Sequence, residues 1–149
     1  VAVIDDFAHH PTAVRETLMA MRARYPERRL IAVFEPRSNT SRRTVFQSDY
    51  ARAFDDADQV VVAEVQDTPI YSATGEVTER FSAQRLASDL RARGGEAVAI
   101  DGVDAIVDHL FRVRGNGDVI VTLSNGAFGA IWEKLLDRLG AVALETDPV

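Results

Sequence analysis

The sequence has 149 residues, of which 46% are hydrophobic and 27% charged, a size and balance typical of one compact domain with a buried core. Its net charge of -6 at pH 7 argues against a general nucleic-acid or anionic-membrane surface, because both partners require clustered Lys and Arg. The absence of cysteine excludes disulfides and thiolate metal sites, and the longest apolar runs have the length of strands. We therefore expect a soluble protein with no nucleic-acid or membrane partner, and its composition permits a cytoplasmic location.

Apolar, β-rich runs alternate with segments of helical period, and this alternation predicts a mainly parallel sheet with helices on both faces. The first strand is expected at residues 1–5; it opens the chain without an initiator Met, and we expect the chain to be a fragment. A helix should begin at Pro11, which suits the first helical position, and end before Pro26. Strands at 30–34 and 60–64 flank a second helix. The apolar face of that helix consists of Phe46, Tyr50, Ala53 and Phe54.

Residues 65–81 are the least regular part of the sequence. Pro69 and Gly75 interrupt it, which predicts an irregular excursion at an edge of the sheet, and we assign it no chemistry. Ser82 can cap the next helix, which the glycines at 94–95 should close, and a fourth strand follows at 96–100.

The last third of the chain predicts two helices around a fifth strand. Apolar residues at helical spacing mark a helix over 103–111, and the strand follows at 118–123. A final helix carries apolar positions from Phe128 to Leu139 and should end at Gly140, after which 141–145 would add an edge strand. The predicted fold is therefore α/β and Rossmann-like, with a mainly parallel sheet of about six strands.

Three polar or glycine-rich segments follow the first, second and fifth strands: residues 5–12 (DDFAHHPT), 35–40 (EPRSNT) and 124–129 (SNGAFG). In an open parallel sheet, ligands gather beyond the carboxyl ends of the strands, where loops meet helix N-termini with free N–H donors. We therefore expect these three segments to converge at one rim and to form the binding site.

The first segment suits a nucleotide. A carboxylate such as Asp6 can accept hydrogen bonds from ribose hydroxyls, and an imidazole such as His9 offers a purine a flat face and a donor. A metal site is an alternative, but no second ligand cluster accompanies these residues and we assign no metal ligand. A structural role is the other alternative, in which His10 caps the helix before Pro11 and Asp5 satisfies N–H groups of the loop.

The second and third segments suit an acidic substrate. Arg37 provides a planar fork for a carboxylate, and Ser38 and Asn39 beside it can each make single hydrogen bonds. In the third segment, Gly126 and Gly129 would allow backbone N–H groups to approach an anion at a helix N-terminus. The alternatives are a polar loop with a helix cap for the second segment, and a tight strand-to-helix turn for the third.

No nucleophile with a neighbouring base occurs in the sequence, and neither does the phosphate-binding Gly-x4-Gly-Lys-Ser/Thr loop. The chain therefore has recognition loops without a reactive centre, and we assign no catalytic residue. The octapeptide at 5–12 resembles the segment that opens the C-terminal domain of Mur ligases, in the branch that acts on UDP-N-acetylmuramate. The segments at 35–40 and 124–129 resemble, more narrowly, the murein peptide ligases, which attach L-Ala-γ-D-Glu-meso-diaminopimelate to that sugar nucleotide.

The resemblance implies a three-domain enzyme of which residues 1–149 are the C-terminal domain, without the N-terminal UDP-sugar domain and the central ATPase domain. ATP and Mg²⁺ would be held mainly by the central domain, so the isolated chain should be inactive. By similarity, Asp6 would contact the ribose of ATP and His9 the adenine. The residues that would line the peptide site are Arg37, Ser38, Asn39, Ser124, Asn125 and Phe128.

Three rival interpretations are compatible with the same sequence. An L-alanine-adding ligase of the same family is the nearest. A receiver domain of a response regulator also begins with an acidic pair after its first strand, but it requires an Asp at the end of the third strand and a Lys at the end of the fifth. Glu64 and Ser124 stand at those places. The last rival is a free-standing nucleotide- or peptide-binding module.

Overall fold

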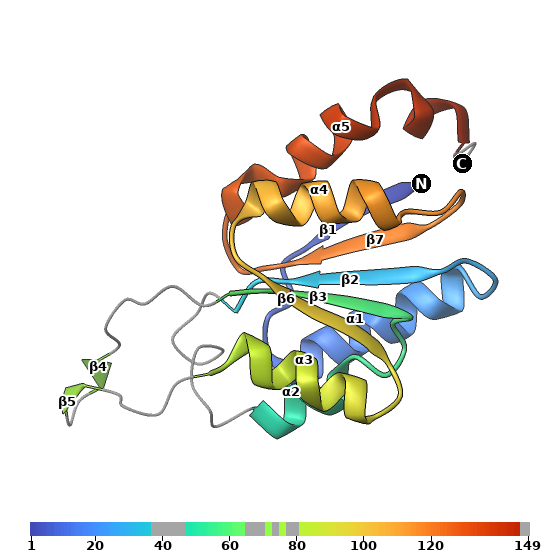
Figure 1. Ribbon diagram of the computed structural model, residues 1–149. Coiled ribbons are helices and arrows are strands. Elements are labelled where there is room, and N and C mark those ends of the chain that lie inside the picture. Colours follow the sequence, from blue (N-terminus) through green and yellow to red (C-terminus); the bar gives the residue numbers. More distant parts are fainter. Residues whose placement is uncertain (37–46, 65–70, 73–74, 77–80, 147–149) are drawn as a thin grey trace.

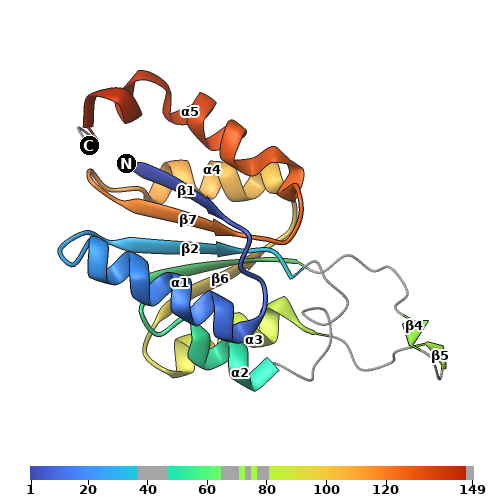
Figure 2. The same cartoon turned by 180° about the vertical axis from the view of Figure 1, so that it is seen from behind.

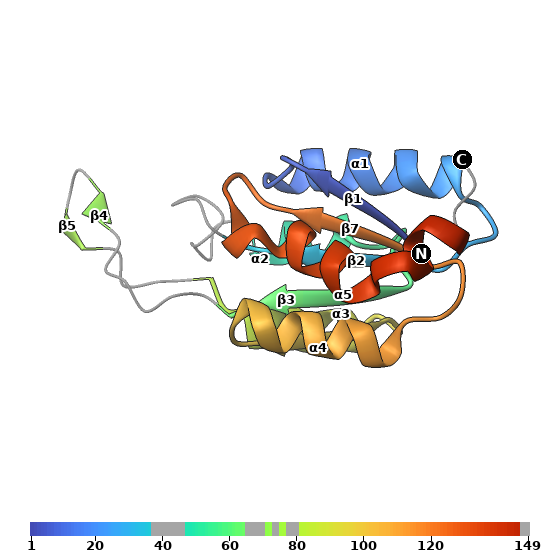
Figure 3. The same ribbon diagram turned by 90° about the horizontal axis from the view of Figure 1, so that it is seen from above.

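The computed structural model describes residues 1–36, 47–64, 71–72, 75–76 and 81–146 (Figure 1). Its centre is a five-stranded parallel sheet in the order β1-β7-β2-β3-β6, and Figure 3 shows β1, β7, β2 and β3 side by side in this order. The strands are β1 (Ala2–Asp6), β2 (Leu30–Phe34), β3 (Gln59–Ala63), β6 (Glu96–Ile100) and β7 (Val119–Leu123). Two short strands, β4 (Tyr71–Ser72) and β5 (Gly75–Glu76), pair antiparallel as a separate hairpin.

Helices cover both faces of the sheet, as Figures 1 and 2 show from opposite sides. One face is covered by α1 (Pro11–Arg24), α2 (Gln47–Ala53) and α3 (Ala83–Ala92), and the other by α4 (Val103–Val113) and α5 (Ile131–Thr146). The chain moves from β1 through β2 and β3 to β6 in one direction, and then returns to β7. Because parallel crossovers keep one hand, this reversal of direction places α4 on the opposite face from α1, α2 and α3.

The central strands β2, β3 and β7 are buried along their whole length, which matches their largely apolar sequences; Gln59 in β3 and Thr122 in β7 are the polar exceptions. Side chains on the α1–α3 face surround an aromatic cluster of Phe34, Tyr50, Phe54 and Phe81, whose neighbouring ring centroids lie 4.9 to 6.3 Å apart. Side chains on the other face pack beneath α4 and α5. The sheet is thus a rigid base between two cores.

The predicted fold class is confirmed, and one predicted element is wrong. Residues 141–145 do not form an edge strand but continue α5 as helix, so the main sheet has five strands instead of six. Gly140 kinks α5 with a φ of 51° rather than ending it. A five-residue apolar run is compatible with a strand or a buried helix segment, and periodicity alone does not distinguish them.

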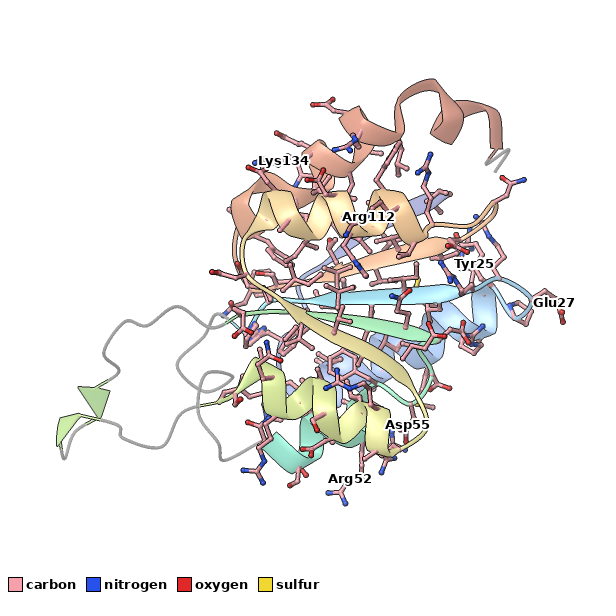
Figure 4. All side chains as sticks on the ribbon, in the orientation of Figure 1. Tyr25, Glu27, Arg52, Asp55, Arg112 and Lys134 are labelled. Atoms are coloured by element: carbon pink, nitrogen blue, oxygen red, sulfur yellow. The ribbon has the colours of Figure 1, made fainter. Side chains whose placement is uncertain are left out.

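The surroundings of His109 on α4 predict that the stability of the domain depends on pH. Its Nε2 lies 3.3 Å from Nε2 of Gln59, whose amide N–H can donate to it only while the imidazole is neutral. Burial, assisted by the charge of Arg112 (labelled in Figure 4), lowers the pKa of His109 below 6.5. The unfolded chain therefore binds the proton more readily than the folded one, so stability should be present above pH 6.5 and fall as the pH drops from there through the folded pKa.

Replacing His109 with Gln should remove this component of the pH dependence. We expect urea unfolding curves of the wild type to give a lower free energy of unfolding at about pH 5 than at about pH 8, and this difference should shrink in His109→Gln. An equal difference in both proteins would show that His109 does not contribute.

Candidate functional site

The three polar segments predicted from the sequence begin at one edge of the sheet. They do so because β7 lies between β1 and β2, and all three strands are parallel. Leu123 at the end of β7 is in register with Asp6 on one side and Phe34 on the other. Past the strand ends, the N–H of Ser124 donates to the carbonyl of Asp6 at 3.2 Å, and the N–H of Glu35 donates to the carbonyl of Leu123 at 3.0 Å. The loops after β1, β7 and β2 therefore begin side by side.

Asp6 is fixed by the loop that follows it. Its Oδ1 accepts hydrogen bonds from the N–H of Ala8 at 2.8 Å and from the hydroxyl of Thr17 on α1 at 3.3 Å. These two bonds orient the carboxylate at the point where β1 turns into α1. Oδ2 accepts no hydrogen bond from the described residues, so that oxygen can accept from a ligand hydroxyl. The ribose contact of Asp6 stays a prediction.

His9 lies in the same turn, and several contacts hold it. Its Nδ1 lies 3.0 Å from the carbonyl of Phe7, and the two rings meet edge to face with centroids 5.6 Å apart. The hydroxyl of Tyr50 on α2 donates to the backbone carbonyl of His9, which ties the turn to the aromatic core. Phe7 is 69% exposed, so the pair presents aromatic surface to solvent next to Asp6. This arrangement suits a flat ligand, and the adenine contact of His9 stays a prediction.

His10 caps the first helix, which is the structural role that the sequence offered as an alternative to ligand binding. It is the N-cap of α1, and its Nδ1 accepts from the N–H of Thr12 at 3.4 Å while Pro11 occupies the first helical turn. Among the described residues, no three His, Asp or Glu side chains are close enough to share a metal ion.

Ser124 joins the loop after β7 to the loop after β2. Its side chain is only 4% exposed, and its hydroxyl donates to Oε1 of Glu35 at 2.6 Å. The same hydroxyl oxygen accepts from the N–H of Gly126 at 3.1 Å. The N–H of Gly126, which the sequence predicts as a donor to an anion, thus already donates a hydrogen bond within the loop.

The turn between Ser124 and α5 is strained. Phe128, Gly129 and Ala130 have φ values of 45°, 56° and 54°, so three consecutive residues are left-handed, and for the two that are not glycine this costs about 1–3 kcal/mol each. Gly129 is required here, because a Cβ at this position would lie 2.9 Å from Cγ2 of Val103. Oδ1 of Asn125 is buried and receives no hydrogen bond from the described residues. Both features are typical of a site built for a ligand.

The six residues predicted to bind the peptide do not all lie at this edge. Ser124 and Asn125 lie at the edge just described, whereas the side chain of Phe128 is buried (2% exposed) and packs in the core beneath α4 and α5. Arg37, Ser38 and Asn39 lie outside the described residues. The peptide contacts of all six residues stay predictions.

Two further residues contribute side chains to this edge, and the sequence alone suggested no site role for either of them. Glu35 receives the hydroxyl of Ser124. Thr122, fully buried in β7, donates from its hydroxyl to Oδ1 of Asp5 at 2.6 Å and so holds that carboxylate against the strand. A hydroxyl inside an otherwise apolar strand is the sequence signal that could have indicated Thr122. Nothing local in the sequence pairs Glu35 with Ser124.

A groove of about 600 Å³ runs between α1 and α2, beside the first loop. It is lined by charges of both signs, among them Arg52 and Asp55, which are labelled in Figure 4. Arg52 is paired with Asp49 at 3.0 Å, and Asp55 with Arg93 at 2.8 Å. These exposed pairs satisfy much of its charge, so the carboxyl edge of the sheet remains the better candidate site.

None of the helices in the described part of the chain has the length and apolar character needed to cross a membrane.

Comparison with known proteins gives the same family from sequence and from structure. Residues 1–126 match the family described as Mur ligase, glutamate ligase domain. The chain is 36% identical over 142 residues to the UDP-N-acetylmuramate–L-alanine ligase of Geobacter sp. (strain M21), covering 95% of this chain and 30% of that protein. The chain thus spans less than a third of the length of this curated relative.

Two solved structures are similar over 93% of this chain. The murein peptide ligase of Psychrobacter arcticus 273-4 is 32% identical, with a TM-score of 0.73 and 27% of its own length covered. A domain of a UDP-N-acetylmuramate:L-alanyl-γ-D-glutamyl-meso-diaminopimelate ligase from Haemophilus ducreyi 35000HP is 33% identical, with a TM-score of 0.65 and 90% of that chain covered. By the extent of these matches and by its fold, this chain belongs to the Mur ligase family, as a C-terminal domain.

Proposed function

We propose that this chain is the substrate-positioning C-terminal domain of an ATP-dependent ligase that joins L-Ala-γ-D-Glu-meso-diaminopimelate to UDP-N-acetylmuramate in the recycling of peptidoglycan. The domain would act together with an N-terminal UDP-sugar domain and a central ATPase domain of the same protein. The observation that carries the proposal is the meeting of the loops after β1, β7 and β2 at one edge, joined there by the bond between Ser124 and Glu35.

In this proposal, the two sides of the edge bind different substrates. Asp6 and His9, in the turn after β1, would contact the ribose and adenine of ATP. Ser124 and Asn125, together with the segment that contains Arg37, would contact the peptide. ATP phosphorylates the muramoyl carboxylate, and the L-Ala amine of the peptide then attacks the acyl phosphate and releases phosphate. The phosphates of ATP and Mg²⁺ would be held by the central domain.

This division of labour has a physical basis. Holding an amine and an acyl phosphate in attack geometry turns a bimolecular step into an effectively unimolecular one, and closure over the intermediate excludes the water that would hydrolyse it. A sheet edge from which both sites project is suited to that role, because β2 and β7 beneath it are fully buried and β1 pairs with β7 along its whole length. The isolated chain should accordingly show no ligase or ATPase turnover.

A second candidate is the C-terminal domain of a UDP-N-acetylmuramate:L-alanine ligase. It is favoured by the curated relatives, since the proteins from Geobacter sp. (strain M21) and Caldanaerobacter subterraneus, at 36% and 35% identity, both carry that name. The tripeptide reaction is favoured by the two solved structures at 32% and 33% identity. Both candidates use ATP, UDP-N-acetylmuramate and an L-Ala amine, and they differ in whether the acceptor extends beyond that first residue.

A full-length ligase that carries this domain separates the two candidates. With ATP and UDP-N-acetylmuramate present, phosphate release should be supported by the tripeptide with kcat/KM roughly 100-fold above that for free L-alanine, because a site built for polar groups rejects a ligand that lacks them. A preference for L-alanine would establish the second candidate. The purified 149-residue chain is the control, and ATP hydrolysis by this chain alone would contradict the proposed division between domains.

A further inference from the structure

The junction between β7 and β2 contains a carboxylate held in one orientation. Ser124, buried to 4% exposure, has a single hydroxyl proton, and it donates that proton to Oε1 of Glu35 at 2.6 Å. The oxygen of the hydroxyl is in turn fixed by the N–H of Gly126 at 3.1 Å. A hydrogen bond of this length to an ionised acceptor is stronger than one between neutral groups, so Ser124 positions the carboxylate of Glu35 at the edge of the sheet.

Two acceptor side chains at this junction, Asn125 and Glu35, have hydrogen-bonding capacity that the described residues leave unused. Oδ1 of Asn125 is buried and takes no hydrogen bond from the described residues. Glu35 is half-buried, and none of the ion pairs in the described part of the chain includes it. The hydroxyl of Ser124 has no donor left once its proton is given to Glu35. A buried acceptor without a donor costs free energy, so a ligand group that brings N–H donors and positive charge would stabilise the junction.

The carboxylates around the junction favour the same ligand charge. Asp5 and Asp6 at the end of β1 are already bonded to Thr122, Thr17 and the N–H of Ala8. Glu35 stands at the end of β2 with one bond from Ser124. An anionic ligand group at this point would meet negative charge, whereas an ammonium group would be attracted and could donate three hydrogen bonds.

We propose that Glu35, positioned by Ser124, binds the ammonium group of the incoming amine substrate, with Oδ1 of Asn125 as a further acceptor. This inference rests on the proposed function in that the reaction consumes an amine, but it holds equally for a peptide and for a single amino acid. It makes Glu35 a specificity-determining residue that selects the end of the acceptor that reacts. Recognition of the acceptor's carboxylates would then fall to other residues.

The first test replaces Glu35 with Gln in the full-length ligase. Gln keeps the size of the side chain and an oxygen that accepts from Ser124, but it lacks the charge. We expect KM for the amine substrate to rise roughly tenfold or more, because hydrogen bonds to charged groups have that effect on affinity, while KM for ATP and the melting temperature stay unchanged. The matched control is Glu64→Gln at the end of β3, where Oε1 accepts from Nε2 of Gln84 at 2.6 Å. This control should leave all three values unchanged.

The second test identifies the group that Glu35 contacts. In a deamino analogue of the acceptor, hydrogen replaces the reacting amino group, so the analogue acts as a competitive inhibitor. Against the wild type, its inhibition constant should exceed KM of the substrate by roughly tenfold. In Glu35→Gln the inhibition constant of the analogue should stay the same, because the analogue has no ammonium group to lose. KM of the substrate should rise until it is about equal to that inhibition constant.

An equal rise of both constants in Glu35→Gln would overturn the inference, because it would show a loss of structure instead of a lost contact with the ammonium group. An unchanged KM in an active Glu35→Gln enzyme would also overturn it, and would leave the proposed function intact. A wild-type enzyme that ligates neither amine would overturn the proposed function and this inference with it.

Discussion

Phe34→Ala is expected to lower the free energy of unfolding of the domain by about 3–5 kcal/mol, a large part of the roughly 5–15 kcal/mol that holds a domain of this size together. Phe34 is the last residue of the buried central strand β2 and has no exposed surface. Its ring contacts Tyr50, Phe54 and Phe81 at centroid distances of 4.9, 5.6 and 6.3 Å. Its removal would therefore leave a cavity in the centre of the α1–α3 core.

The measurement is urea unfolding of the purified chain, followed by circular dichroism. Phe7→Ala is the matched control, because Phe7 is 69% exposed and its loss should change the free energy of unfolding by no more than about 0.5 kcal/mol. Should Phe34→Ala prove unfolded without urea, Phe34→Leu keeps most of the volume and should cost about 1–2 kcal/mol. A loss below about 1 kcal/mol in Phe34→Ala would contradict the packing described for this core.

The second large effect concerns function, and two substitutions should each weaken the use of a different substrate. In the full-length ligase, Arg37→Ala should raise KM for the acceptor about 10- to 100-fold and change KM for ATP little, because a bidentate bond to a carboxylate is lost. His9→Ala should weaken the use of ATP and leave the acceptor nearly unaffected, since His9 lies with Phe7 in the turn after β1.

Steady-state kinetics with one substrate varied at a time measure both effects. His10→Asn is a suitable control for His9, because Asn can cap α1 as His10 does and should leave both KM values near those of the wild type. If Arg37→Ala and His9→Ala weakened both substrates equally, the assignment of the two loops to different substrates would be wrong.

Much of the fold could be predicted from the sequence because its local signals agree with one another. Residues 30–34 and 96–100 are predicted as strands with the bounds that the structure has. The first is a continuous apolar run typical of a buried parallel strand, and the second is a short apolar run bounded by a pair of glycines. Ser82 caps α3 as predicted, with its Oγ accepting from the N–H of Arg85 at 3.1 Å. Such caps and runs depend on a few neighbouring residues, and the sequence contains them directly.

The end of the chain could not be predicted in the same way. Residues 141–145 are apolar over too short a length to separate a strand from a helix, and the structure continues α5 through them after a kink at Gly140. The sequence likewise gives no reason to expect the left-handed turn at Phe128 and Ala130, because residues other than glycine adopt it only when their surroundings impose it. Phe128 is held there by the core into which its ring packs.

The sequence by itself determined that polar segments follow the strands of an α/β domain, and that those segments carry the residue types that bind nucleotides and charged substrates. Only the tertiary structure decided which segments meet. The strand order places β7 between β1 and β2, and this brings the hydroxyl of Ser124 to the carboxylate of Glu35 across 89 residues of sequence. Strand order follows from the hand of the crossovers and from the packing of helices on both faces. These are properties of the whole chain, so no local pattern contains them.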